Sequence, residues 1–182
     1  GVTLASQLSG MRGELMDAYG AVRMHALWAK VVAWATAQQM IATQDCVNGI
    51  RAIDVNLFDE AFMLAGQEIA CATSIPYPTA LGQLELVARI GDCMPQSWMA
   101  LDRGEISLQH VKALARASQH CSPRVAEAVE AKLIPIAVTR GWTPSELARA
   151  ARKEVIKLDP EGATKRAAAA KADADVEAFH GA

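Results

Sequence analysis

The chain has 182 residues, of which 52% are hydrophobic and only 5% aromatic, and its formal net charge at pH 7 is −2. Abundant alanine, the strongest helix former, and few of the aromatic residues that favour strands predict an all-α fold rather than one built on a sheet. The net charge excludes a uniformly basic chain of the kind that coats nucleic acid. Residues 140–171 nevertheless carry eight basic and four acidic side chains, which fits either a solvated helix face or a surface that meets phosphate.

The spacing of the cysteines and the length of the apolar stretches indicate the compartment in which the protein is expected. The four cysteines lie 25, 22 and 28 residues apart without a CxxC pair, which argues against a zinc site and for reduced thiols in the cytoplasm. The most apolar stretch, residues 26–37, contains Lys30 and is too short to cross a bilayer. No signal peptide is visible, and the start at Gly1 rather than Met suggests an excerpt of a longer protein.

The first third of the chain has helical periodicity. Residues 3 to about 43 are predicted to form one long helical region with a break or kink near Gly20, and its second half should be buried on most sides, with Trp28 and Trp34 in the core. The turn signal Asn48-Gly49 predicts a loop over residues 44–56. We therefore expect an N-terminal unit, 1–56, that forms one compact body with the core at 57–182.

Two helices of helix-turn-helix proportions come next. The first is predicted over 57–72, with Asp54 or Asn56 as its cap. The second is predicted over 79–90, with Ser74 capping the turn and Gly91 ending the helix. A short helix should then open at Pro95.

Residues 100–117 predict a corner between two helices. Gly104 can take the positive φ that ends one helix, and Ser107 can cap the next, predicted over 108–120. Further on, Ser122 and Pro123 should open a helix that is strained by Pro135 and ends at Gly141.

The last predicted helices are the most basic. Thr143-Pro144-Ser145-Glu146 is a capping-box sequence, and the helix it begins has an apolar face and a basic remainder. Asp159 should cap an alanine-rich helix that runs to about Phe179.

Two families resemble this pattern. Over about sixty residues the chain resembles the ParB-type helix-turn-helix domain, through Met94-Pro95 and the corner. From 57 to 179 it is similar to the actinobacterial domain-of-unknown-function family 222, the helical region that precedes HNH-type endonuclease domains. The resemblance rests on TPSEL at 143–147, LDPEGATKR at 158–166 and the corner residues Gly104, Ile106, Ser107 and His110. It implies a helical domain that accompanies a nuclease, with His110 packing or hydrogen bonding between helices.

The same comparison yields candidate DNA-binding residues. The helix at 79–90 corresponds to the reading helix, where Thr79, Gln83 and Arg89 can face DNA while Ser74 and Tyr77 contact its backbone. Arg89 is the only base of that helix, so the helices after Thr143 are the stronger candidates for phosphate contact. Their candidate residues are Arg149, Arg152, Lys153, Lys157, Lys165 and Arg166.

Catalysis is not expected in this span. The histidines lack the spacing of an HNH site, and no hydrolase, phosphate-loop or dinucleotide motif is present, so we expect no cofactor or metal. The sequence favours a non-catalytic DNA-binding or targeting domain of an HNH-endonuclease-type protein, with duplex DNA and a C-terminal HNH domain as partners. The alternative is a helical interaction domain without DNA contact, forming homo-oligomers through its N-terminal helices.

Overall fold

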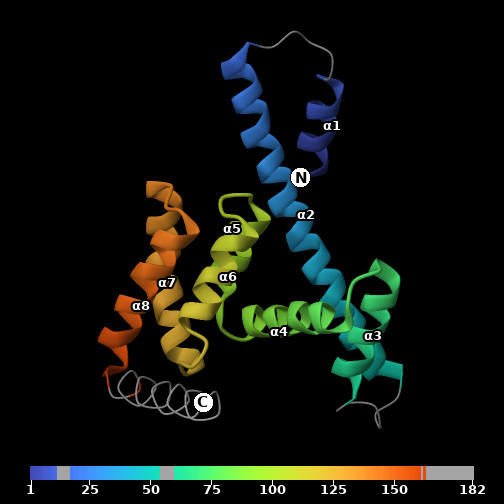
Figure 1. Ribbon diagram of the computed structural model, residues 1–182, viewed down its shortest axis with the longest axis vertical. Helices are drawn as coiled ribbons and strands as arrows, with labels where there is room; N and C mark the ends of the chain where they lie inside the picture. Colours follow the sequence, from blue (N-terminus) through green and yellow to red (C-terminus); the bar gives the residue numbers. More distant parts are fainter. Residues whose placement is uncertain (12–16, 54–59, 161, 163–182) are drawn as a thin grey trace, which may run out of the picture.

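The computed structural model describes residues 1–11, 17–53, 60–160 and 162, and these residues form an all-α, multi-helix fold. Within them lie eight α-helices and no strand (Figure 1). The helices are α1 (Val2–Gly10), α2 (Ala18–Ile53), α3 (Ala61–Thr73), α4 (Tyr77–Cys93), α5 (Pro95–Asp102), α6 (Leu108–Ala117), α7 (Pro123–Arg140) and α8 (Pro144–Leu158). The predicted all-α class is thus confirmed.

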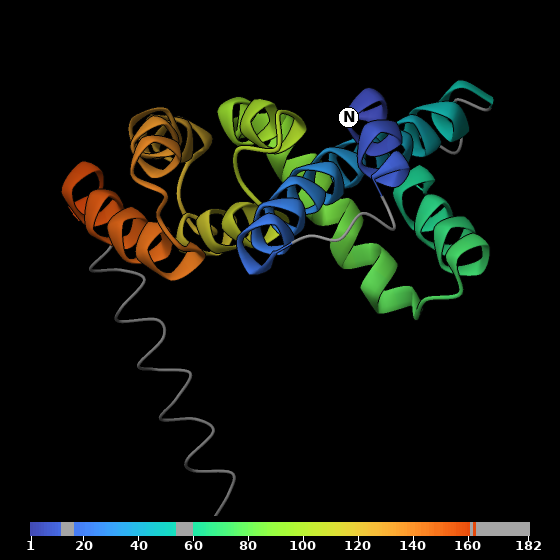
Figure 2. The ribbon, with the colours of Figure 1, turned by 90° about the horizontal axis from the view of Figure 1, so that it is seen from above.

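Helix α2 is the spine of the molecule. It runs from α1, which packs beside its first half, to α3 at its far end, and α4 and α5 pack against its second half (Figure 1). Beyond this spine, α5 and α7 form one layer and α6 and α8 a second (Figure 2). The main core lies between α2 and these layers, where Met94, Leu101, Val111 and Leu147 are fully buried.

The predicted loop over residues 44–56 is wrong as far as Ile53, because α2 continues through Asn48 and Gly49. Val47 is buried in a second, smaller cluster with Ala61, Ala65 and Leu84, and the apolar area it removes from water outweighs the turn preference of Asn-Gly. Residues 54–56 lie outside the described part of the chain.

The break in the N-terminal helices also differs from the prediction. Helix α1 ends at Gly10 and α2 begins at Ala18, so Gly20 lies in the first turn of α2 instead of at a break. The Gly20 N–H donates to Asp17 Oδ1 over 2.7 Å, so Asp17 satisfies an amide that the helix itself leaves unpaired.

From Ala33 to Val47, the buried residues of α2 lie on one face, while Val31 is buried on the opposite side. Ala33, Ala37 and Met40 are buried, whereas Val32 is 62% exposed and Ile41 40% exposed. Trp28 and Trp34 are half-buried. The expectation of burial on most sides is therefore wrong, because neighbouring helices cover only part of the circumference of α2.

The turn between α3 and α4 is built differently from the predicted one. Ser74 adopts a left-handed conformation, with φ 55° and ψ 38°, and closes α3 instead of capping α4. Helix α4 begins at Tyr77 because Pro78 fits its first turn, and it continues past Gly91 to Cys93. Helix α3 begins at Ala61, and the caps predicted for it at residues 54 and 56 lie outside the described residues.

The helices after the corner largely follow their sequence signals. The Ser122 hydroxyl accepts from the Val125 N–H at the start of α7, and Gly141 ends that helix with φ 61°. Helix α6 ends at Ala117, three residues before the predicted end, because Ser118 Oγ donates to the Leu114 carbonyl and Arg89 binds the chain there. Beyond Pro160, the predicted alanine-rich helix lies outside the described residues except for Gly162.

Candidate nucleic-acid interface

The corner joins α5 to α6 and packs against α2. Gly104 has φ 70°, as its sequence context predicts, and a methyl group in its place would lie 2.8 Å from Lys30 Cβ on α2. Ile106, two residues further on, is 5% exposed and belongs to the main core. The corner is therefore both a helix end and a point of close backbone approach.

His110 connects the corner to the turn between α7 and α8. Its Nδ1 accepts from the Ser107 N–H over 3.2 Å, so Nε2 carries the proton and donates to the Trp142 carbonyl over 2.7 Å. Ser107 and His110 thus form a reciprocal capping box. The expected role of His110 in hydrogen bonding between helices is confirmed, since it joins the first turn of α6 to the segment that begins α8.

On α4, two candidate side chains have structural partners. The Arg89 guanidinium donates to the Ser118 carbonyl, and its Nη2 lies 3.2 Å from Ser118 Oγ. The Tyr77 ring packs against Gly66 of α3, where an added Cβ would lie 3.0 Å from it. Both side chains therefore hold α4 in place within the bundle.

The remaining α3–α4 candidates lie near a groove. Thr79 is exposed and Gln83 half-buried, and both line a groove of about 790 Å³ between α2, α4 and α6. Ser74 is exposed at the end of α3. Helix α4 thus forms one side of a groove whose other sides are α2 and α6, and its candidate side chains face that groove.

Helix α8 presents the other group of candidates. Leu147, Ala151 and Val155 are buried on one side, and Arg149 and Lys153 lie on the opposite side, one turn apart and exposed. Arg152 and Lys157 are exposed on the flanks of the same helix. Among the residues that the structure describes, no carboxylate forms a salt bridge with Arg149, Arg152 or Lys153.

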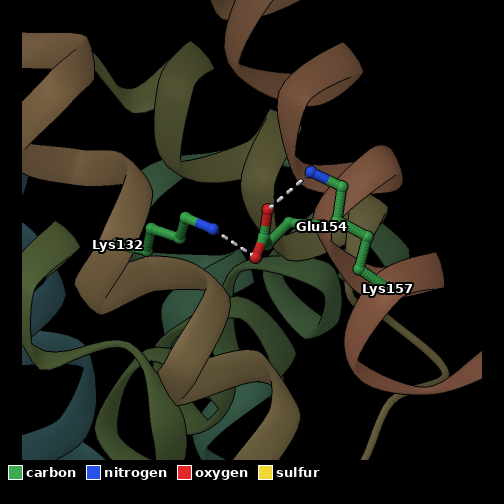
Figure 3. A network of polar contacts seen from close by, with 3 residues as sticks. All are labelled: Lys132, Glu154 and Lys157. Carbon is green, nitrogen blue, oxygen red and sulfur yellow. Dashed lines mark hydrogen bonds and ion pairs between the residues drawn. The ribbon is translucent and has the colours of Figure 1, made fainter.

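The acids of α8 are engaged within the protein. Glu146 Oε2 accepts from the Thr143 N–H over 2.7 Å, completing the predicted capping box, and this bond lowers the pKa of the Glu146 carboxyl. Glu154 Oε1 lies 2.5 Å from Lys132 Nζ of α7, and Glu154 Oε2 lies 3.7 Å from Lys157 Nζ (Figure 3). Lys132 holds the pKa of Glu154 below its usual range, which keeps this interhelical network charged at neutral pH.

Two basic residues that the sequence interpretation did not select also lie in this region. Lys112 and Arg116 of α6 line the groove between α2, α4 and α6. Two basic residues four positions apart are common on any solvent-exposed helix face, so the sequence gives no signal for them. The groove becomes visible only once α2 and α4 are placed beside α6. Lys165 and Arg166 lie outside the described residues.

Metal-binding and membrane-spanning features have their own structural requirements. No group of three or more His, Cys, Asp or Glu side chains in the described residues is placed to hold a metal ion. In those residues, too, no helix has the length and apolar character needed to cross a bilayer. All four cysteines are described, and none of them forms a disulfide.

The described fold and surface define an all-α protein with a basic helix on its outside. Compared with known proteins, the chain matches no protein-family model, no curated protein and no solved structure. The resemblance to family 222 and to the ParB-type domain therefore stays a prediction from the sequence motifs.

Proposed function

We propose that this chain is a non-catalytic DNA-binding, or targeting, domain that contacts the phosphate backbone of duplex DNA through α8. The observation that supports the proposal most is the exposure of Arg149, Arg152 and Lys153 on one helix, without a described salt bridge to any of them. When solvent-exposed cations of a helix contact the phosphates of DNA, the counterions condensed on the DNA are released, and this release drives binding.

The same geometry favours backbone contact over base reading. Arg89, the only base of α4, binds Ser118 inside the protein, and Thr79 and Gln83 line the groove between α2, α4 and α6. Contacts to phosphate carry no sequence information by themselves. We therefore propose binding of low sequence specificity, in the micromolar range or weaker at physiological salt.

The sequence motifs support a proposal about the protein in which this domain acts. The resemblance to family 222 supports a role beside an HNH-type nuclease domain of the same protein, which would supply the chemistry while this domain supplies affinity. The absence of disulfides among the four cysteines fits the reducing cytoplasm, where we place the protein.

The test is a binding titration of a fluorescent duplex at low salt, about 50 mM. We expect the wild type to bind and the triple variant Arg149→Glu, Arg152→Glu, Lys153→Glu to bind about 100-fold more weakly or worse, because three attractive contacts become repulsive. Thermal unfolding followed by circular dichroism verifies that the variant is folded.

The matched control reverses three exposed arginines elsewhere, with the same change in net charge: Arg23→Glu, Arg103→Glu and Arg124→Glu. We expect this control to lose much less affinity than the α8 variant, since long-range repulsion is screened beyond about 10 Å at 0.1 M salt. Equal losses in both variants would mean that only net charge matters, and a wild type that does not bind at low salt would refute the proposal.

One observation favours the alternative, a helical domain that forms dimers with a second copy. Tyr19, Val22, Ala26 and Ala29 form an exposed stripe on α2, with Tyr19 82% and Val22 68% exposed. They are spaced three and four residues apart, and the same spacing leads on to Ala33, the first residue of the buried stripe of α2. This spacing is typical of a coiled-coil seam. Light scattering decides this case: a dimer that Val22→Glu dissociates would favour the alternative, and a monomer that binds DNA would exclude it.

A further inference from the structure

Helix α6, like α8, carries basic side chains away from its buried side. The two helices pack side by side in one layer, and His110 joins the start of α6 to the turn that begins α8 (Figure 2). Val111, Leu114 and Ala115 bury one side of α6, which leaves Arg116 exposed and Lys112 half-buried on a flank. These two cations are one helical turn apart, about 6 Å along the axis.

That flank forms a wall of the groove between α2, α4 and α6. Besides Lys112 and Arg116, the groove is lined by Arg89 of α4, whose guanidinium binds Ser118, and by uncharged polar side chains, including Gln39 of α2, Gln83 of α4 and Gln119, which follows α6. The acids of the groove, Glu85 and Asp92, both belong to α4. Lys112 and Arg116 thus lie on the α6 wall without a described salt bridge, and the α4 wall carries the carboxylates together with Arg89, which is bonded inside the protein.

We infer that the DNA-contacting surface extends from α8 across α6 to the edge of this groove, and that Lys112 and Arg116 bind phosphates of the same duplex. The inference rests on the function proposed above and adds a second helix to it. In the described residues, neither side chain forms a salt bridge that would compete with phosphate. The carboxylates on α4 repel phosphate, so the sugar–phosphate backbone stays on the α6 side, within reach of the amide of Gln119.

The number of phosphates contacted is measurable. The slope of the logarithm of the binding constant against the logarithm of salt concentration is about −0.9 for each phosphate neutralised on duplex DNA. Five contacts, from Arg149, Arg152, Lys153, Lys112 and Arg116, give a slope of about −4.5 for the wild type. The variant Lys112→Gln, Arg116→Gln removes two contacts and gives a slope of about −2.7.

The control variant Arg23→Gln, Arg103→Gln loses the same charge from exposed positions that belong neither to α6 and α8 nor to the lining of the groove, and its slope should equal that of the wild type. An α6 variant that keeps the wild-type slope and unfolding temperature would overturn this inference and leave the α8 proposal standing. A slope reduced equally in both variants would overturn it as well. If the wild type does not bind duplex DNA, the proposed function itself fails, so the two failures are distinguishable.

Discussion

Replacing Gly104 by alanine is expected to lower the free energy of unfolding by about 3–5 kcal/mol. Two costs add at this position. The left-handed φ of 70° strains any residue with a Cβ, and the new methyl group would lie 2.8 Å from Lys30 Cβ and 2.9 Å from the Lys30 carbonyl oxygen. Because that carbonyl belongs to the backbone of α2, it cannot move aside without displacing the helix. Chemical denaturation followed by circular dichroism measures the loss.

Gly141 provides the matched control. It also has a left-handed conformation, with φ 61°, but no atom lies within 4 Å of the position that a Cβ would take. Gly141→Ala should therefore cost only the backbone strain, about 1–2 kcal/mol. The difference between the two variants measures the close approach of the corner to α2. If both variants lose the same stability, that approach does not hold the corner in place.

Replacing Glu130 by alanine is the second substitution with a large expected effect, a loss of about 2–4 kcal/mol. Glu130 of α7 is fully buried, and its Oε1 accepts from the Ser97 N–H at the start of α5 over 2.5 Å. Alanine would leave that buried amide without an acceptor and would open a cavity between the two helices. Glu130→Gln keeps a carbonyl oxygen for the same bond and should lose much less stability at acid pH.

The ionisation of Glu130 gives the wild type a pH dependence of stability that Glu130→Gln lacks. Burial raises the pKa of its carboxyl above the ordinary value of 4.5, although hydrogen bonds from Ser97 and Gln96 oppose the rise. Between the unfolded and the folded pKa the folded state binds more protons, so the stability of the wild type falls as the pH rises through this interval. Glu130→Gln removes that contribution, and its stability relative to the wild type should therefore improve as the pH rises above 4.5. A difference that is independent of pH would contradict this assignment.

Local signals in the sequence predicted correctly those helix ends that are set by a capping side chain or by a glycine. Thr143 with Glu146, Ser122 with Pro123, and Gly104 all occupy the positions that their side chains or backbone freedom predict. These preferences act within four residues, so they survive folding unchanged.

The features that the sequence did not predict depend on contacts between residues that are distant in the chain. Asn48-Gly49 is helical because Val47 is buried against α3 and α4, and Ser74 ends α3 instead of starting α4. Arg89 is a plausible DNA contact in the sequence, but the structure brings Ser118, 29 residues away, to its guanidinium. Lys112 and Arg116 become candidate phosphate contacts only because the surrounding helices form a groove beside them. Nothing in their own segment of sequence distinguishes them from other basic residues.

The most direct test of the central claim is a comparison of backbone amide chemical shifts by NMR with and without a short duplex. We predict that the shifts change mainly at exposed positions of α8 around Arg149 and Lys153, and on the flank of α6 that carries Lys112 and Arg116. Changes confined to α3 and α4 would contradict the account, because they would place DNA on those two helices instead of on the basic helices α6 and α8.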